Sequence, residues 1–426
     1  MPESDDSLSR NDLLLGGVRL VSGQIVDVGL RDGNVQAIGT PGTLPAAAER
    51  LDLSGYLLLP APAEPHAHFD TALTADRISN PTGDLSGAID AWLDYQGSVP
   101  QGDFVARATE AALLGLANGT TAIRTHVGIY EPVGISAVEA LLEVREQLRD
   151  LVDLQLVALT VELTGPECAD LRAMLRAAME LGADVVGGCP HLDPRPVAYH
   201  DLTLSLASEF GRAIDLHTDE TLDAGVLHLP HFADLVATTG FPYGATASHC
   251  VSLGVQSPER AAEVAAKVAA APVAVVCNPQ TNLFLQAREQ DSAPVRGLTA
   301  LRVLLDAGVT VAGGGDNLRD PFNPVGRVDP LETASLLVTA GHLTPEEAYA
   351  AVSTGARAAM GLPEVQVAPG FPAELLAVRA SSLGEAIAGG TSRIVIHHGR
   401  IVSRTTVTRE FPDARAAALA AQRSLP

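Results

Sequence analysis

The sequence predicts a (β/α)8 TIM barrel, an α/β fold, with a small β-sandwich domain formed by the N- and C-terminal segments. Eight apolar, strand-like runs alternate with helix-like stretches through the middle of the chain. Such alternation indicates a parallel sheet covered by helices, and eight units over roughly 300 residues are typical of a closed barrel. Both ends of the chain contain instead short strand-like runs separated by turns. We therefore expect two structural parts of different kinds.

Residues 1–59 and 366–426 are expected to form the small β-domain. Runs such as "LLLGGVRLV" and "QIVDVGLRDG" near the start, and "SRIVIHHGRIVSRTTVTRE" near the end, combine β-branched residues with glycine-containing breaks. This pattern is typical of strands and turns. The barrel is expected to span residues 60–365, and we find no tandem repeat of fixed period in the sequence.

The eight predicted barrel strands follow one another through this middle region. In chain order they are "YLLLPAPAEPHAH", "TTAIRTHVG", "DLQLVALTVE", "ADVVGGCPH", "AIDLHTDE", "GATASHC", "VAVVCNP" and "VTVAGGGD". Intervening stretches such as residues 136–149 have apolar residues at the spacing of an amphipathic helix. Catalytic side chains of such barrels lie at the carboxyl ends of the strands, so polar residues should gather at the ends of these runs.

Charge and cysteine content exclude several classes of protein. The formal net charge of −23 disfavours nucleic acid and anionic membrane surfaces as partners. The four cysteines, Cys168, Cys189, Cys250 and Cys277, show no CxxC spacing, so we expect small buried thiols in a reducing compartment. We find no signal-peptide pattern at the start and no apolar run of membrane-spanning length. We expect a cytoplasmic protein.

Polar residues do gather at the ends of the predicted strands. They are His66 and His68 (run one), His126 (run two), His191 (run four), His217, Asp219 and Glu220 (run five), His249 (run six) and Asp316 (run eight). Imidazole nitrogen and carboxylate oxygen are ligands that zinc and similar divalent ions favour. The four expected to converge as metal ligands are His66, His68, His217 and Asp316. Glu220 is close enough to these to transfer protons, and His249 is placed to orient a metal-bound hydroxide.

Each of these residues also has an ordinary interpretation. An HxH pair can occupy a turn after a strand, and Asp316 followed by Asn317 can cap a helix or a turn. His126 and His191 can line the pocket or bond to the backbone. Four further histidines are expected at the surface or in packing: His200, His228, His231 and His342. A coincidence would have to place suitable residues at the ends of four different strands.

Taken together, the motifs resemble the amidohydrolase superfamily and, within it, the cytosine deaminase branch. The matching stretches are "EPHAHFDTALTA", "GDLSGAIDAW", "ANGTTAIRTHV", "LGADVVGGCPH", "IDLHTDE", "TASHC", "NPQTNLFLQ" and "DNLRDPFNPVGRVDPLE". The resemblance covers nearly the whole chain, including the β-domain divided between its ends. It implies hydrolytic deamination of a cyclic amidine, in which metal-bound hydroxide attacks the ring carbon that bears the amino group.

Carried over by position, the resemblance implies a ligand set and catalytic roles. The ligands of one divalent ion, Zn or Fe, become His66, His68, His217 and Asp316. Glu220 becomes the proton shuttle, His249 the residue beside the hydroxide, and Asp316 counts as catalytic as well. The only lysine, Lys267, lies in a helix-like stretch. The carbamylated lysine that bridges two metals in other superfamily members therefore has no counterpart at a strand end, and a single metal is expected.

The expected substrate contacts depart from those of true cytosine deaminases. Val161, followed by Glu162, stands where those enzymes have a glutamine that pairs with the pyrimidine, and valine cannot make that contact. Asn317 replaces a second acid. Phe322 lies in "DNLRDPF", which resembles the enzyme that removes isopropylamine from N-isopropylammelide. Leu85, in the loop after the first strand, is also expected to contact the substrate.

The sequence thus predicts a metal-dependent hydrolytic deaminase of a small amino-substituted N-heterocycle: cytosine-like, pterin, triazine or creatinine-like. An alternative is a hydrolase that releases an alkylamine from a substituted triazine or opens a cyclic amide. A third hypothesis is a barrel that binds a ligand without catalysis, although the presence of ligands, shuttle and orienting histidine argues against it. The expected partner is a small heterocyclic substrate, and we expect no binding to nucleic acid or membranes. The resemblance is also compatible with a homo-oligomer.

Overall fold

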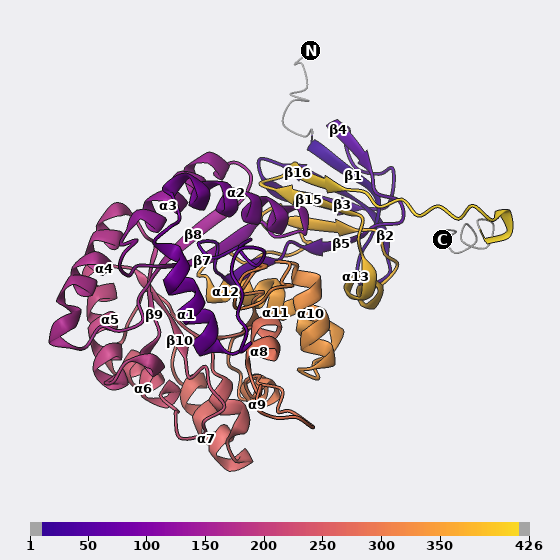
Figure 1. Ribbon diagram of the computed structural model, residues 1–426. Coiled ribbons are helices and arrows are strands. Elements are labelled where there is room, and N and C mark those ends of the chain that lie inside the picture. The colour runs from indigo at the N-terminus through magenta and orange to yellow at the C-terminus, as the bar shows by residue number, and fades with distance from the viewer. Residues whose placement is uncertain (1–10, 417–426) are drawn as a thin grey trace. The chain divides into compact units, whose positions relative to one another are not determined.

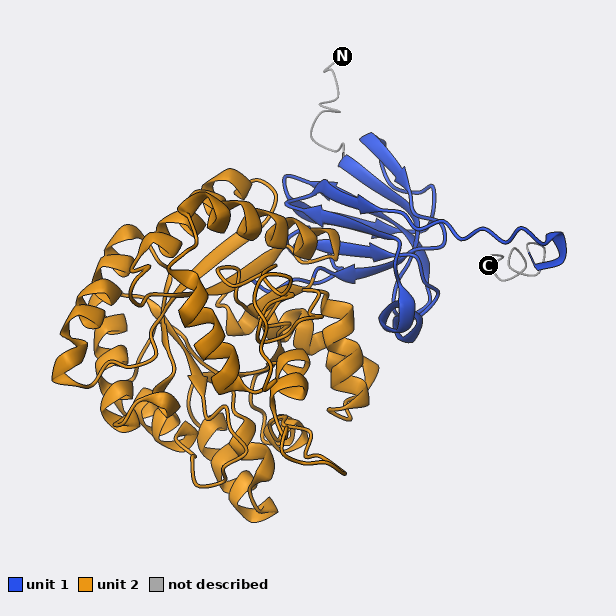
Figure 2. Ribbon diagram, in the orientation of Figure 1, with its two compact units in different colours: residues 1–61, 363–426 blue, residues 62–362 orange. Residues whose placement is uncertain are grey.

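The computed structural model describes residues 11–416, which form two compact units (Figures 1 and 2). The smaller unit combines the segment that ends at Ala61 with the segment that begins at Pro363. The larger unit is Pro62–Leu362. Residues 1–10, part of the stretch considered for a signal peptide, and residues 417–426 lie outside the described residues. Between residues 11 and 416, no helix is long and apolar enough to cross a membrane.

The larger unit is the predicted barrel. Its parallel strands pair in chain order: β6 (Ala63–Ala67), β7 (Ala122–Gly128), β8 (Asp153–Leu159), β9 (Val185–Gly188), β10 (Ala213–Thr218), β11 (Ala245–His249), β12 (Val273–Cys277) and β13 (Val311–Gly313). Every residue of β6, β7, β11 and β12 is buried. Burial on both faces is typical of the parallel strands of such a barrel, and the predicted fold class is confirmed.

Helices surround these strands (Figure 1). They are α1 (Leu85–Gln96), α2 (Gln101–Ala117), α3 (Ser136–Leu148), α4 (Ala169–Leu181), α5 (Pro196–Phe210), α6 (Leu229–Thr239), α7 (Pro258–Ala269), α8 (Pro279–Leu285), α9 (Leu301–Asp306), α10 (Pro330–Thr339), α11 (Pro345–Val352) and α12 (Thr354–Ala359). In α7, the Ser257 side chain accepts a hydrogen bond from the Arg260 N–H and Pro258 occupies the first turn. Both features are typical helix starts.

A buried ion pair fills the interior of the barrel below the strand ends. Nη1 of Arg124, on β7, donates to Oδ2 of Asp215, on β10, at 2.8 Å. The Ser248 hydroxyl donates to the other oxygen of Asp215 at 2.8 Å, and Nε of Arg124 donates to Gln155. Asp215 lies two residues before His217, so this satisfied polar layer supports a strand that ends at the site.

The smaller unit is built on one mixed sheet. Its strands are β1 (Asn11–Arg19), β2 (Ile25–Arg31), β3 (Asn34–Gly39), β4 (Ala47–Asp52), β5 (Leu57–Pro60), β14 (Leu375–Val378), β15 (Arg393–His397) and β16 (Arg400–Thr405), with helix α13 (Leu383–Gly389). The pairing order is β16-β15-β14-β5-β1-β2-β3, and β4 pairs with β1 as a branch. The chain ends thus form the expected small β-domain, as a single branched sheet in which distant segments pair.

Candidate active site

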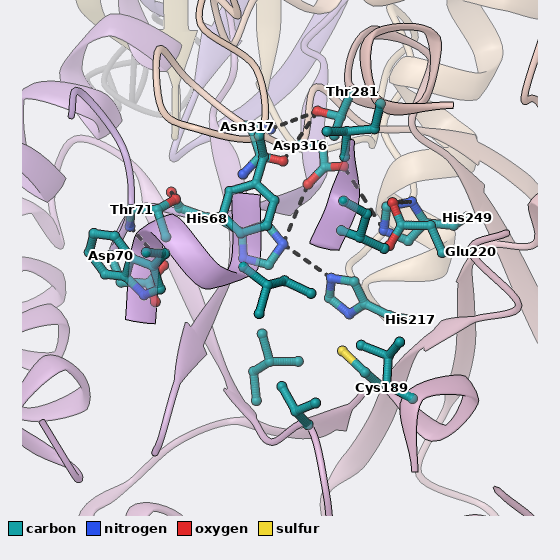
Figure 3. A pocket seen from close by; sticks show the side chains of 18 of the residues that line it. His68, Asp70, Thr71, Cys189, His217, Glu220, His249, Thr281, Asp316 and Asn317 are labelled. Carbon is teal, nitrogen blue, oxygen red and sulfur yellow. Dashed lines mark hydrogen bonds and ion pairs between the residues drawn. The ribbon is translucent and has the colours of Figure 1, made fainter. Parts of the chain in front are cut away.

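The predicted site residues surround a cavity at the carboxyl ends of the barrel strands (Figure 3). The cavity encloses about 680 Å³, including the part open to solvent. His68, His217, Glu220, His249 and Asp316 line it together, and Figure 3 shows their side chains gathered at one end. Residues from four different strand ends therefore meet, as the barrel geometry requires.

The four predicted ligands form a compact cluster. Nε2 of His68 lies 3.1 Å from Nε2 of His217 and 3.4 Å from Oδ1 of Asp316. Nε2 of His66 lies 3.6 Å from the same Asp316 oxygen. His66, His217 and Asp316 are buried, and His68 is mostly buried. Three imidazoles and a carboxylate that converge this closely are suited to hold a small cation.

Burial sets the protonation of the cluster. It lowers the pKa of His66 and His217 well below the ordinary value, helped by the neighbouring imidazoles, and lowers that of His68 to about 3. These rings are therefore neutral and present lone pairs. Burial also raises the pKa of Asp316, and the nearby acids Glu220, Asp320 and Glu64 raise it further.

Several donor atoms of the cluster lack a partner within the described part of the chain. Both ring nitrogens of His66, Nδ1 of His217 and Oδ2 of Asp316 are buried without a hydrogen bond. Buried polar groups are normally paired, so such a group of orphaned atoms calls for an explanation. Neutral imidazoles and a carboxylate are a donor set that fits a divalent metal ion, and the buried His/Asp cluster is thus consistent with metal binding.

Glu220 and His249 lie together beside this cluster. Oε1 of Glu220 lies 3.2 Å from Nδ1 of His249, and Nε2 of His249 lies 3.9 Å from Oδ2 of Asp316. Burial raises the pKa of Glu220 to about 8 and lowers that of His249 to about 3. A carboxyl group with such a pKa can both hold and release a proton near neutral pH.

The turn that carries Glu220 is held by its neighbour. Asp219 has φ 51°, an uncommon conformation for a residue other than glycine. Its carboxylate accepts hydrogen bonds from the backbone N–H groups of His228 and Leu229 at the start of α6. The His228 ring also bonds to it, at 3.0 Å. These contacts fix the direction in which the chain leaves β10 and therefore the placement of Glu220.

Sequence reasoning missed the two asparagines of "NPQTN" that contact His249 and Glu220. Nδ2 of Asn282, on α8, donates to Oε1 of Glu220 at 3.1 Å. The Asn282 amide also lies against Nδ1 of His249, and Nδ2 of Asn278 lies 3.3 Å from its Nε2. If Asn278 donates to Nε2, then Nδ1 holds the ring proton and points it at Glu220. The available signal was a pair of amides directly after the seventh strand.

The remaining histidines take different positions. The His126 ring packs against that of His66 at an angle of 36°, with ring centroids 4.0 Å apart. His191 bonds through Nδ1 to the backbone carbonyl of His217 at 3.0 Å, so it contacts the backbone of a predicted ligand. His200 and His231 stack between α5 and α6, and His342 bonds to Arg296. Cys168, Cys189, Cys250 and Cys277 are free and buried, as expected.

The substrate end of the cavity is mainly apolar. Of the predicted contacts, Leu85, Val161, Asn317 and Phe322 line the cavity, and Glu162 does not. Trp92 and Tyr130 line it as well, and the sequence alone did not point to them. The Asn317 amide is already bonded, since Nδ2 donates to Asp320 and Oδ1 accepts from Thr281. A mainly apolar cavity wall with few free polar groups remains for a ligand.

Three comparisons with known proteins agree with this geometry. The model of the amidohydrolase family matches residues 106–403. A pterin deaminase from Rhizobium rhizogenes is 33% identical over 398 residues, which cover 91% of this chain and 89% of that protein.

Two solved structures share the fold over nearly their whole length. A 5-methylcytosine deaminase from Klebsiella pneumoniae, liganded with phosphonocytosine, has a TM-score of 0.84 at 28% identity and covers 94% of this chain and 100% of its own. An N-isopropylammelide isopropylaminohydrolase from Burkholderia multivorans has a TM-score of 0.81 at 28% identity, covering 93% and 99%. The resemblance predicted from the motifs is confirmed, and the chain belongs to the amidohydrolase family.

Proposed function

We propose that this chain is a metal-dependent hydrolytic deaminase of a small amino-substituted N-heterocycle. The observation that supports this most strongly is the position of the buried Glu220 carboxyl group. It shares one cavity with the histidine cluster and lies 3.2 Å from His249. A proton carrier beside a cluster of neutral imidazoles is what hydrolysis of a C–N bond requires.

In this proposal one divalent ion, Zn or Fe, is held by four side chains. They are His66, His68, His217 and Asp316. Such an ion acts as a Lewis acid and lowers the pKa of a bound water to about 7. A single ion is supported by the position of Lys267, the only lysine of the chain, which lies on α7 and bonds to Asp234 at 2.8 Å. No lysine is therefore available to bridge two ions at a strand end.

Glu220 is proposed to move the protons. Asn282 and His249 hold its Oε1, which keeps the carboxyl group directed into the cavity. Water adds to the ring carbon that bears the amino group, and its proton passes to Glu220. Glu220 gives this proton to the ring nitrogen, then takes the remaining proton of the added hydroxyl group and delivers it to the amine as the C–N bond breaks. The products are a ring carbonyl with an adjacent N–H, and ammonia.

The apolar walls support an uncharged, planar substrate. Trp92, Tyr130 and Phe322 offer aromatic surface to a ring. Val161 lines the cavity and provides no hydrogen bond, which weighs against cytosine itself, whose amide edge would be left unpaired there. The 33% identity to a pterin deaminase makes a pterin the first substrate to test.

Release of an alkylamine is a second candidate within the same machinery. Its support is the likeness to an N-isopropylammelide isopropylaminohydrolase at 28% identity. The reacting carbon and the proton carrier would be the same, and only the leaving group would differ. Apolar residues such as Leu85 and Leu285 in the cavity wall could take up an alkyl substituent.

A substrate panel tests both candidates. Metal-loaded enzyme is given a pterin, cytosine, 5-methylcytosine, N-isopropylammelide and creatinine, and ammonia and alkylamine are scored separately. We expect ammonia from at least one ring, and release slowed by about 10²- to 10⁴-fold in the Glu220→Gln variant. If no ring releases either amine, or if Glu220→Gln works as fast as the natural sequence, the catalytic proposal is wrong.

A further inference from the structure

Glu64 is a buried acid that the proposed reaction does not use. It lies on β6, two residues before His66, and only 3% of it is exposed. A bulge interrupts the strand register between Glu64 and Ala67, so hydrogen bonds, rather than strand alternation, place Glu64 relative to His66 and to His68, which follows β6. A carboxylate at this depth is costly unless it is paired or hydrogen-bonded.

Two backbone N–H groups bond to the Glu64 carboxylate. The His66 N–H donates to Oε1 at 3.1 Å. The Gly315 N–H donates to both oxygens, at 3.0 Å to Oε1 and 2.9 Å to Oε2. One donor belongs to the first barrel strand and the other follows the last, so the carboxylate bridges them.

This bridge lies where the first barrel strand, β6, meets the last, β13, a place that we call the seam of the barrel. β6 and β13 stand at opposite ends of the strand order, and in the described chain no continuous ladder joins them. The Asp316 N–H donates to the His66 carbonyl at 2.9 Å, and the His68 N–H donates to the Asp316 carbonyl at 3.3 Å. The N–H groups of His66 and Gly315 are both donors and cannot bond to one another, and the Glu64 carboxylate between them is an acceptor for both.

The glycines of "GGGD" make room for the Glu64 carboxylate. A Cβ added to Gly315 would lie 2.9 Å from Oε2 of Glu64. A Cβ added to Gly314 would lie 3.0 Å from Oε1 of Glu64 and 2.6 Å from Oδ1 of Asn278. Neither residue has a positive φ, so close approach of the carboxylate, rather than turn conformation, explains why glycine stands here.

We propose that Glu64 is a positioning residue that locks the seam and so fixes the mutual placement of His66, His68 and Asp316. The inference rests on the proposed function, because it takes these three residues as metal ligands. They come from the ends of two strands between which the described chain has one isolated bridge, Ala67 with Asp316, and no continuous ladder, and a metal site needs its ligands held within about 0.5 Å. The Glu64 bridge supplies that constraint directly beneath them.

Cobalt binding to the metal-free full chain tests this role without relying on activity. Co²⁺ affinity is measured by competition with a chromophoric chelator, and ligand geometry by the visible absorption of bound Co²⁺. Glu64→Gln keeps the size of the side chain but places an amide NH₂ against the backbone donors. We expect roughly 10- to 100-fold weaker Co²⁺ binding and an altered absorption band.

Glu374→Gln is the matched control. Glu374 is equally buried, at 3% exposure, and accepts a hydrogen bond from the His398 N–H at 2.8 Å in the smaller unit. Its replacement should lower the melting temperature and leave Co²⁺ affinity and absorption unchanged. A general loss of stability would therefore not imitate the effect expected for Glu64→Gln.

Gly315→Ala is the second variant, because its methyl group would displace the carboxylate while Glu64 remains. It should weaken Co²⁺ binding and alter the absorption band, as Glu64→Gln does. If Glu64→Gln does not fold, Gly315→Ala alone tests the positioning role of Glu64. Natural affinity and absorption in the folded variants would overturn the positioning role alone. If the natural sequence binds no Co²⁺, the proposed metal site itself is wrong, and the role of Glu64 falls with it.

Discussion

At the scale of single residues, the neutral state of the buried histidines determines what the site can bind. Burial lowers the pKa of His66 and His217 well below the ordinary value, so each ring keeps a lone pair for a cation. Burial and the nearby Glu220 raise the pKa of Asp316. A divalent cation would attract the carboxylates of Asp316 and Glu220 and so offset the cost of burying their charges. The burial of these side chains thus favours a metal ion.

Glu220→Gln removes the proton carrier and leaves its size unchanged. We expect kcat to fall by about 10²- to 10⁴-fold, because general acid–base catalysis is lost. Metal content should stay at the natural level, since Glu220 is not among the four proposed ligands. Steady-state kinetics and metal analysis of the same preparation check this, and a kcat within tenfold of the natural value would contradict the shuttle role.

Asn282→Leu removes the amide that holds Glu220 and His249. A misplaced catalytic group costs on the order of 10²-fold, so we expect a large loss in kcat with little change in KM. Gln280→Leu is the control, because Gln280 is a buried amide on the same helix that bonds to Thr333 instead. Equal losses in the two variants would show that helix α8, and not the Asn282 contact, is responsible.

At the scale of elements, the end of β10 is held by contacts outside the cluster. Beneath the site, the Arg124–Asp215 pair links β7 to β10 at 2.8 Å. Asp219 ties the end of β10 to the start of α6. His191 bonds to the backbone at His217, one residue before β10 ends. The strand that carries His217, a proposed ligand, is thus fixed by three independent contacts.

Arg124→Met tests the buried pair. It leaves Asp215 as an uncompensated buried charge, so we expect a loss of about 3 to 5 kcal/mol in the free energy of unfolding. Arg176→Met breaks the exposed pair with Glu209 and should cost no more than about 1 kcal/mol. Urea denaturation of both variants measures the difference, and similar losses would refute this view of the barrel interior.

The start of α11 offers a test by pH. Glu347 completes a capping box with Thr344 and pairs with Arg302. The Arg302 hydrogen bonds, followed by the Thr344 N–H, lower the pKa of Glu347 to about 2 from the ordinary 4.5. For an acid with a lowered folded pKa, the stabilisation is complete above pH 4.5 and is lost as the pH falls toward 2.

Glu347→Gln should therefore be less stable than the natural sequence at pH 6 by a small amount, since the side chain is one third exposed. The gap in melting temperature should narrow as the pH falls below about 4.5. A gap of the same size at pH 6 and at pH 3.5 would show that the carboxylate charge contributes nothing here.

At the scale of the whole molecule, the sequence predicted the features that leave a pattern in a short stretch of the chain. The barrel was predictable because its strands are buried on both faces and so form continuous apolar runs. His66, His217 and Asp316 were predictable as a cluster because strand ends meet at one face of a barrel. The pairing of β4 and β5 with β1 joins segments far apart in the sequence, and no local pattern states such pairing.

Other residues of the site could not be predicted, because their roles depend on how distant elements pack together. Trp92 lies on α1, whose placement over the cavity follows from the path of a long loop. Asn282 lies on a short helix, and only its position beside Glu220 shows its role. Glu64 appeared in the sequence merely as an acid inside an apolar run. Its bonds across the seam explain both that acid and the glycines of "GGGD".

Metal removal acts on the whole fold. An ion that binds only the folded chain stabilises it by about 4 kcal/mol when present at roughly 1,000 times its dissociation constant. We expect chelator-treated protein to melt at a lower temperature and the addition of Zn²⁺ to restore the original value. Calorimetry on one preparation before and after treatment measures this, and an identical melting temperature would speak against a resident metal.

The central claim is that one metal ion in the His/Asp cluster supports hydrolysis of a C–N bond. Its most direct test is a titration of metal-free enzyme with Zn²⁺ while ammonia release from the preferred heterocycle is followed. We predict that the rate rises in proportion to added metal and stops rising at one ion per chain. Activity in the metal-free enzyme, or a rise that continues to two ions per chain, would contradict the claim.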